Sequence, residues 1–467
     1  MTPVPLTAAD VAAAVRGRLV SGSPAMPIGR VSIDSRTVAA GDFFVAIRGE
    51  RFDGHEFVAG AVAAGAAGVL VERLPRAGEL PAGTLLVEAA DTTAALQDLA
   101  RHVRRASQAQ VVAITGSAGK TTTKEICAEL LSARYRVFRN KGNLNNHIGL
   151  PLSLLELRMK PEVAVVELGM NHPGEISTLV GIAEPEIRVW TNVGDAHIGF
   201  FASADAIADA KAEILDGASA ESVLVANADD ARIMARAGAF KGRVVTFGID
   251  RAASVRAGGV QLRGLDGVRA DVETAAGAFR LQTPLLGMGN LANVLAATAV
   301  AVTLGVPLDA IAARAAALRP ASHRGELLRL PGGITLIDDS YNSSPSALKR
   351  SLEIMAAATG SARKVAVLGE MLELGDHAVA LHRECGRAAR EAGLDLLVAV
   401  GADAARSLAD EAHAAGMPAR AVSFVATREE AVDEALGRVR PGDLVLVKGS
   451  RGIGLDAVVD RLKAEFA

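Results

Sequence analysis

Residues 110–123 read QVVAITGSAGKTTT and predict a nucleotide-binding turn. An apolar run typical of a buried strand comes first, a glycine-rich turn follows, and a helical pattern begins near Lys120. This order of strand, glycine loop and helix is typical of the entrance to a nucleotide-binding sheet. The strict GxxxxGKS/T pattern is not met, because its first glycine would fall at Ile114, and the sequence has TGxxGKTT instead.

The residue types of this loop suit the binding of ATP. A glycine-rich turn lets successive backbone N–H groups converge on phosphate oxygens, and the helix behind it adds its positive N-terminal end. Lys120 would neutralise the β- and γ-phosphates, and the Thr121 hydroxyl would contact Mg²⁺. The alternative, a tight turn followed by a solvated lysine, is disfavoured by the strand and helix on either side. The residues predicted to hold the nucleotide are Gly116, Ser117, Gly119, Lys120, Thr121 and Thr122.

Two later strand ends carry candidate magnesium ligands. The apolar run VAVVELG contains Glu167 at its end, and an acidic residue at a strand tip beside a phosphate loop suits a second Mg²⁺ contact. Its alternative role is to cap the turn before Pro173. The segment WTNVGDAHIG places Asp195 and His197 in a loop at the next strand end. Spacing alone favours a structural, hydrogen-bonded role for His197, because neutral imidazole is not a common first choice for Mg²⁺.

The wider pattern is that of an α/β protein with three domains. In residues 1–107, strand-like runs (VSIDS, LLVEA) flank an Ala/Gly-rich helical stretch, and we expect a smaller N-terminal α/β domain. Residues 108–319 alternate strands with helices, which predicts a mainly parallel central sheet with a small antiparallel excursion at 251–286. From 320 to 467, four apolar runs separated by helical segments predict a Rossmann-like, doubly wound domain.

Composition limits the classes of partner. Half of the 467 residues are apolar but only 3% are aromatic, so the core must be built from Ala, Val and Leu. Fifty basic and 53 acidic residues give a net charge of −3, which offers no basic field for nucleic acid. The apolar stretch 291–308 contains Asn293 and is better explained by a buried helix than by a membrane span.

The cysteines and the first residues bear on location. Cys127 and Cys385 lie far apart and form no CxxC pair, which favours a reduced compartment. Asp10 precedes the first basic residue, Arg16, and the charged start and apolar run of a signal peptide are missing. We therefore expect a cytoplasmic protein without membrane insertion. Nothing in the composition demands an assembly, so a monomer is expected.

Long motifs recur along nearly the whole chain, and together they resemble the Mur ligase family. In order, they are SIDSRTVAAGDFFVAIRGERFDGHEF, TGSAGKTTTKE, KGNLNNHIGLPLSLL, VELGMNHPGEI, TNVGDAHIGFFAS, ADAKAEIL, GMGNLANVLAA, SHRGELLRLPGGITLIDDSYNSSPSAL, LGEMLELGDHAVALHRECG and LVKGSRG. Within the family, DDSYNSSP with LGEMLELG is similar to the member that adds D-alanyl-D-alanine to UDP-N-acetylmuramoyl-tripeptide. The DNPR segment of the sister that adds a diamino acid does not occur here, and folylpolyglutamate synthase lacks the SIDSR domain.

The resemblance implies roles for individual residues. Lys120 and Thr121 would hold ATP phosphate and Mg²⁺, and Glu167 and His197 would support two magnesium ions. The other implied contacts are Asn290 and Asn293 near adenine, Arg324 and Asp339 closing over ATP, Ser35 and Arg36 at the uridine nucleotide, and Asn145 and Asn146 at substrate or phosphate.

Lys211, in the helical segment ADAKAEIL, has two interpretations. The plain one is a lysine paired with nearby acids, Asp209 or Glu213, which would contribute little. The family resemblance implies that this lysine is carbamylated, because CO₂ added to the amine yields an anion that can help to hold Mg²⁺.

The resemblance also implies a reaction. The substrate carboxylate would attack the γ-phosphate of ATP to form an acyl phosphate, with Lys120, Arg324 and Mg²⁺ neutralising charge, and the amine of D-alanyl-D-alanine would then displace phosphate. The KGSRG segment could contact the dipeptide carboxylate, although a strand-end turn explains it almost equally well. Alternatives are a related ligase with another amine or acceptor, or a P-loop nucleotide switch. An NKxD base-reading segment is missing, since residues 140–143 read NKGN.

Overall fold

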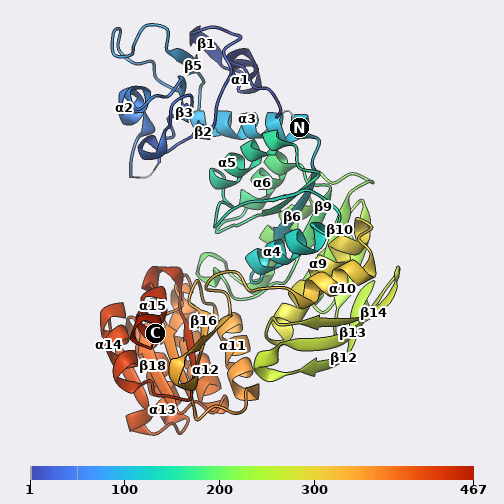
Figure 1. The fold of residues 1–467 in the computed structure, drawn as a ribbon, viewed down its shortest axis with the longest axis vertical. Helices are drawn as coiled ribbons and strands as arrows, with labels where there is room; N and C mark the ends of the chain where they lie inside the picture. The colour runs from blue at the N-terminus through green and yellow to red at the C-terminus, as the bar shows by residue number, and fades with distance from the viewer. Residues whose placement is uncertain (1–2, 50, 467) are drawn as a thin grey trace. The chain divides into compact units, whose positions relative to one another are not determined.

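The computed structural model describes residues 3–49 and 51–466 (Figure 1). They form two compact units, each built from separated parts of the chain. Unit 1 comprises the described residues of 1–113, 135–187 and 216–218, and unit 2 those of 114–134, 188–215 and 219–467. Strands and helices alternate through both units, which confirms the α/β class predicted from the sequence.

The N-terminal sheet of unit 1 has five strands in the order β1-β5-β4-β3-β2. Its strands are β1 (Arg18–Ser21), β2 (Val31–Ser32), β3 (Phe43–Val45), β4 (Gly68–Val71) and β5 (Leu85–Glu88), and its helices are α1 (Ala8–Ala14), α2 (Val58–Ala63) and α3 (Thr92–Ser107). All neighbouring pairs are parallel except β1 with β5. The expected strand at VSIDS is shorter than predicted, because the Asp34 side chain accepts from Arg36 N and caps a 3-10 turn, η1 (Ser35–Thr37).

The second sheet contains nine strands in the order β14-β13-β12-β11-β10-β9-β6-β8-β7. They are β6 (Gln110–Thr115), β7 (Val137–Arg139), β8 (Val163–Glu167), β9 (Ile187–Trp190), β10 (Val223–Asn227), β11 (Arg243–Gly248), β12 (Val255–Leu262), β13 (Val268–Thr274) and β14 (Gly277–Thr283). The pairs β7–β8, β10–β11 and β11–β12 are parallel, whereas β12, β13 and β14 form an antiparallel meander. The predicted antiparallel excursion is therefore confirmed.

Seven α-helices accompany these strands in the described chain: α4 (Lys120–Leu131), α5 (Gly149–Leu155), α6 (Glu175–Ala183), α7 (Ala204–Ala212), α8 (Ala231–Ala237), α9 (Gly287–Thr303) and α10 (Leu308–Ala316). Helices α4 to α8 lie between successive strands from β6 to β11, and α9 and α10 follow β14. The predicted apolar helix is α9, whose residues from Leu291 to Ala301 are almost all buried. Its small Ala side chains let it pack closely against α4. Among the described residues, no helix is long and apolar enough to cross a membrane.

The C-terminal lobe, residues 326–465 of unit 2, contains a six-stranded sheet in the order β15-β16-β20-β17-β18-β19. Its strands are β15 (Glu326–Leu330), β16 (Ile334–Asp339), β17 (Arg363–Gly369), β18 (Leu396–Val400), β19 (Val422–Val425) and β20 (Asp443–Lys448). Its helices are α11 (Pro345–Ala357), α12 (Ala378–Glu391), α13 (Asp403–Ala414), α14 (Arg428–Arg438) and α15 (Asp456–Glu465). Only β15 runs antiparallel to its neighbour.

Both faces of this sheet are covered, as the prediction of a doubly wound domain requires. Alternate side chains of β20 enter different cores: Leu444 and Leu446 pack with α11, α12 and α13, whereas Val445 and Val447 pack with α14 and α15. Figure 1 shows α11 and α14 on opposite sides of the sheet. The sequence analysis missed the two edge strands, β15 and β19, because neither is a continuous apolar run.

Candidate active site

The phosphate loop joins β6 to α4 in unit 2, and two glycines set its shape. Gly116 and Gly119 both have positive φ, +150° and +79°. A Cβ on Gly116 would lie 2.0 Å from Thr191 Oγ1, and one on Gly119 would lie 2.3 Å from Asn293 Oδ1. Neither position accepts a side chain without displacing a neighbour. Glycine at both positions therefore lets the loop backbone approach Thr191 and Asn293 closely.

The first residues of the loop are held by the end of β9. Ser117 N donates to Asn192 O at 3.0 Å, and Ala118 N donates to Asn192 Oδ1 at 2.9 Å. The Ser117 hydroxyl accepts from Gly194 N at 2.9 Å. Ser117, predicted to bind nucleotide, is thus placed in the loop with its hydroxyl engaged by the neighbouring strand end. Sequence reasoning missed Asn192, because its partners lie far away in the chain.

Lys120 and Thr121 open α4, as predicted. Lys120 Nζ donates to Gly116 O at 2.9 Å, so the side chain folds back across the loop. Behind the loop, Thr123 Oγ1 donates to Asn293 Oδ1 at 3.2 Å, and Asn293 in turn donates to Asn290 Oδ1 at 3.3 Å. The two asparagines of α9 therefore brace the start of α4. Their expected contact with adenine stays a prediction, as does the nucleotide role of Thr122, which is half-buried in the same turn.

Arg324 reaches the start of α4 from the segment that leads into the C-terminal lobe. Its Nη2 lies 3.4 Å from Thr121 Oγ1, so the predicted guanidinium and the predicted phosphate-binding threonine are brought together. The guanidinium lies over the ring of Tyr341, 4.0 Å from the centroid, and Arg451 lies 5.4 Å from the same centroid. Tyr341 was not singled out from the sequence, although it stands within the motif DDSYNSSP.

Asp339, at the end of β16, is held within the C-terminal lobe. Its Oδ2 accepts from Lys448 Nζ at 2.6 Å and from Ser351 Oγ at 2.9 Å. Lys448 also donates to Asn342 O at 3.1 Å and is 3% exposed. The carboxylate predicted to contact ATP is therefore oriented by a buried lysine from the KGSRG segment.

Lys211 lies near the end of α7 and is 1% exposed. Among the described residues, no hydrogen bond or ion pair reaches its Nζ, so neither Asp209 nor Glu213 is its partner; Asp209 pairs with Arg236 instead. Burial, and then the positive charge of Lys120, lowers the pKa of Lys211 well below its ordinary value of 10.5. The plain interpretation of a surface lysine paired with acids is wrong, and the surroundings of Lys211 disfavour the charged form of its amine.

His197 faces a carboxylate of the C-terminal lobe. It precedes the short turn η4 (Ile198–Phe200), and its Nδ1 lies 2.6 Å from Glu373 Oε2, although the atoms are not aligned as a straight hydrogen bond. The interaction with His197 lowers the pKa of Glu373, against the opposing effect of burial. Glu373 O also accepts from Gly199 N at 2.9 Å. Sequence reasoning missed Glu373, although it belongs to the quoted motif LGEMLELG.

The remaining predicted phosphate and metal residues lie in unit 1. Glu167 ends β8 as expected, is 3% exposed, and accepts from Asn145 Nδ2 at 2.8 Å. Asn146 Oδ1 accepts from Ile148 N and Gly149 N and so stabilises the start of α5. Asn145 thus orients the carboxylate predicted to bind metal, and Asn146 has a local capping role. Their ligand contacts stay predictions.

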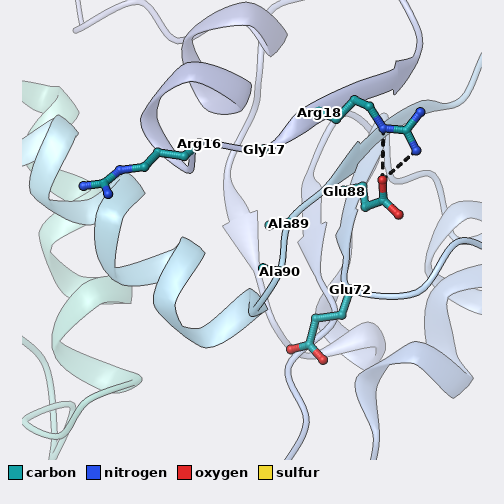
Figure 2. A pocket seen from close by; sticks show the side chains of 7 residues that line it. All are labelled: Arg16, Gly17, Arg18, Glu72, Glu88, Ala89 and Ala90. Carbon is teal, nitrogen blue, oxygen red and sulfur yellow. Dashed lines mark hydrogen bonds and ion pairs between the residues drawn. The ribbon is translucent and has the colours of Figure 1, made fainter.

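Ser35 and Arg36 lie on the turn η1 of the N-terminal sheet. Arg36 pairs with Asp34 at 2.7 Å and its side chain is 86% exposed, which leaves it accessible to a ligand. Hydrogen bonds from Arg36 lower the pKa of Asp34 to about 2. Figure 2 shows a separate open pocket of unit 1, whose lining includes Arg18 and Glu88, an ion pair at 2.7 Å; none of the predicted site residues lines it.

Comparisons with known proteins agree with these motifs. Three family descriptions match the chain: "Mur ligase family, catalytic domain" at 27–104, "Mur ligase middle domain" at 114–301 and "Mur ligase, glutamate ligase domain" at 323–451. A relative from Bacillus subtilis, UDP-N-acetylmuramoyl-tripeptide--D-alanyl-D-alanine ligase, is 33% identical over 98% of both chains. MurF from Acinetobacter baumannii superimposes with a TM-score of 0.89 at 32% identity, covering 99% of this chain and 100% of that one. MurF ligase from Thermotoga maritima in complex with ADP gives 0.82 at 30% identity, covering 94% and 97%.

Proposed function

The chain belongs to the Mur ligase family, and from this membership we propose that it joins D-alanyl-D-alanine to UDP-N-acetylmuramoyl-tripeptide, using ATP and releasing ADP and phosphate. The product is the UDP-N-acetylmuramoyl-pentapeptide of peptidoglycan synthesis. The observation that carries the proposal is the approach of Arg324 to Thr121 at the head of the phosphate loop. The name of the Bacillus subtilis relative, 33% identical over 98% of both chains, supports the choice of substrates.

The residues of unit 2 suit the activation of a carboxylate. A carboxylate is a poor electrophile, so its oxygen first takes the γ-phosphoryl group of ATP, giving an acyl phosphate and ADP. Lys120 and Arg324 neutralise the charge that spreads over the transferring group. The neutral amine of D-alanyl-D-alanine then attacks the acyl carbon, and phosphate leaves. The ADP complex of the Thermotoga maritima relative supports the use of an adenine nucleotide.

The available donors suit magnesium rather than a metal that needs a full protein cage. Within the described residues, no three His, Cys, Asp or Glu side chains gather as a metal site. Mg²⁺ commonly binds one or two protein carboxylates together with water and substrate phosphates, so it does not require a cluster of three protein ligands. We assign the protein contacts to Thr121, Glu167, His197 and a modified Lys211. The ion would supply positive charge to the phosphates.

Lys211 has the surroundings that carbamylation requires. Its neutral Nζ attacks the carbon of CO₂, a proton passes to solvent, and the lysine becomes a carbamate anion. The positive charge of Lys120 repels the charged form of the buried amine, so the modification replaces a repulsion with an attraction. The burial of Lys211 and its lowered pKa support this proposal.

The substrate contacts of unit 1 are part of the same proposal. We assign the uridine nucleotide to the region of Ser35 and Arg36, and substrate or phosphate to Asn145 and Asn146. Asn290, Asn293 and Asp339 are assigned to the adenosine part of ATP. The exposure of Arg36 supports the first assignment.

Purified protein with ATP, Mg²⁺ and UDP-N-acetylmuramoyl-tripeptide tests the function. D-Alanyl-D-alanine, D-alanine, diaminopimelate or glutamate is added in separate reactions, phosphate is measured, and the product is identified by mass spectrometry. Phosphate release that requires both the tripeptide nucleotide and the dipeptide, with a pentapeptide product, is expected. Turnover only with another amine or acceptor would replace the substrates but keep the ligase chemistry. Nucleotide hydrolysis without any amide product would favour a nucleotide switch.

A further inference from the structure

The loop 194–201 is anchored to the C-terminal lobe by several independent contacts. Gly199 N donates to Glu373 O, and Ile198 packs against the buried core of the lobe. A Cβ on Gly199 would lie 2.5 Å from Gly375 N, so the two backbones touch where no side chain fits. The loop is therefore fixed in position by backbone contacts that do not involve the imidazole of His197.

The side-chain contact between His197 and Glu373 is additional to this anchoring. His197 and Glu373 both have left-handed backbones, with φ of +65° and +66°, and their side chains meet. His197 Nδ1 is buried, and a carboxylate oxygen lies 2.6 Å away. No protein partner for Nε2 is found among the described residues. The two nitrogens of the ring are thus in different surroundings.

A histidine that binds a metal through one nitrogen commonly donates its other N–H to a carboxylate. That carboxylate fixes the tautomer and the orientation of the ring, and it raises the basicity of the ligating nitrogen. We infer that Glu373 is a positioning residue, which holds the Nδ1 side of His197 and leaves Nε2 as the nitrogen that would bind the magnesium ion. This inference rests on the metal role given to His197 under the proposed function.

The carboxylate of Glu373 and the imidazole of His197 come from different parts of unit 2. Glu373 belongs to the loop after β17 in the C-terminal lobe, whereas His197 follows β9 of the nucleotide-binding sheet. The histidine is fully oriented only while the lobe is docked on the loop. Metal affinity and docking of the C-terminal lobe are therefore coupled through this pair.

Metal affinity, rather than turnover, is the decisive measurement. Mn²⁺ binding to the full-length protein is followed by electron paramagnetic resonance with adenylyl imidodiphosphate present. The variants are Glu373→Ala, Glu373→Gln, His197→Ala and the double variant of Glu373→Ala with His197→Ala. Asp376→Ala is the matched control, since Asp376 is an exposed acid of the same loop. Each substitution at position 373 keeps the main-chain carbonyl that accepts the hydrogen bond from Gly199 N.

Glu373→Ala is expected to weaken Mn²⁺ binding by roughly 10- to 100-fold. Glu373→Gln, which keeps an acceptor oxygen, is expected to lie between Glu373→Ala and the unmodified protein, and Asp376→Ala should match the unmodified protein. In the His197→Ala background, Glu373→Ala should have no further effect, because the carboxylate acts through the imidazole.

The inference is overturned if Glu373→Ala leaves Mn²⁺ affinity unchanged, or if it weakens binding equally with and without His197. The second result would assign Glu373 to docking of the lobe alone. If His197→Ala itself leaves Mn²⁺ affinity unchanged, the metal role of His197 fails together with the inference. The ligase proposal is tested separately by the amide product, so its failure is distinguished from either result.

Discussion

Two buried lysines of unit 2 lie in opposite surroundings. Lys448, at the end of β20, donates to the Asp339 carboxylate at 2.6 Å and to the Asn342 carbonyl at 3.1 Å. Lys211, near the end of α7, is equally buried, yet no acceptor reaches its Nζ within the part of the chain that the structure describes. The charge that acts on it is the positive one of Lys120.

The difference shows what burial alone does to an amine. A buried ammonium group is stable where a carboxylate and a carbonyl replace water, as they do at Lys448. Where those groups are missing, the neutral amine is favoured, and a neutral amine is a nucleophile. The same residue type is therefore structural at the end of β20 and suited to chemistry at the end of α7.

The largest effect is expected from replacing Lys211. Lys211→Ala and Lys211→Arg should each lower kcat by roughly 10²- to 10³-fold, because neither side chain can become a carbamate that supports the charged transition state. Phosphate release measures the loss, and ¹³C nuclear magnetic resonance with labelled bicarbonate detects the carbamate in the wild-type protein. Lys463→Ala, at an exposed position of α15, is the control. Wild-type turnover in Lys211→Arg would refute the carbamate.

Replacing Lys448 should instead affect the stability of the fold. Lys448→Met leaves the Asp339 carboxylate without its cation, and we expect the free energy of unfolding to fall by about 3 kcal/mol. The control is Lys349→Met, since Lys349 and Glu384 also pair at 2.7 Å but their side chains are 39% and 43% exposed. That loss should stay below about 1 kcal/mol. Urea denaturation measures both, and equal losses would contradict the comparison.

His382 extends the comparison to a buried base whose partners match its neutral form. Its Nε2 accepts from Met371 N at 2.9 Å, and its Nδ1 lies 2.7 Å from Ala378 O. Burial lowers the pKa of His382 below its ordinary 6.5, so below that pH the unfolded chain binds more protons than the folded one. This contribution to stability is present above pH 6.5 and is lost as the pH falls toward the folded pKa.

Urea denaturation at pH 7.5, 6.5 and 5.5 tests this sign. We expect the unmodified protein and the exposed-site variant His377→Gln to lose about 1 kcal/mol more over this range than His382→Gln, whose side chain does not titrate. The same pH slope in all three proteins would mean that His382 contributes nothing to it.

The smallest effect is expected where a cation is held by a ring rather than by a carboxylate. Tyr341→Leu removes the aromatic face under Arg324, 4.0 Å from its guanidinium carbon. The loss should be about 0.5 to 1 kcal/mol, which corresponds to a decrease in kcat/KM for ATP of roughly two- to fivefold. Tyr341→Phe keeps the ring and should retain most of the activity. A loss in Tyr341→Phe as large as in Tyr341→Leu would assign the effect to the hydroxyl.

The sequence predicted the elements of the site better than their mutual contacts. The phosphate loop, the start of α4 and the position of Glu167 follow from local pattern, because a glycine turn and an apolar run constrain their own neighbourhood. The pairing of Lys448 with Asp339 joins residues 109 positions apart, and the approach of Glu373 to His197 crosses from one sheet to another. Such partners are chosen by tertiary packing, which leaves no periodic signal.

The same distinction explains the errors in the local interpretation. Lys211 had acids nearby in sequence, but its helix turns the side chain into the core, away from them. The run VSIDS has strand composition, yet the Asp34 side chain competes for backbone N–H groups and ends the strand after Ser32. Composition therefore predicts the end of a strand poorly where a short polar side chain binds the backbone.

The interleaving of the two units has a consequence for synthesis on the ribosome. Residues 114–134, which carry the phosphate loop, emerge early, but the rest of unit 2 comes from 188–215 and from residue 219 onward. A nascent chain that ends before residue 188 therefore displays the loop without Asn192, Asn293 or Arg324, which support and approach it. These contacts to the phosphate loop therefore become complete only after the chain has been synthesised beyond residue 324.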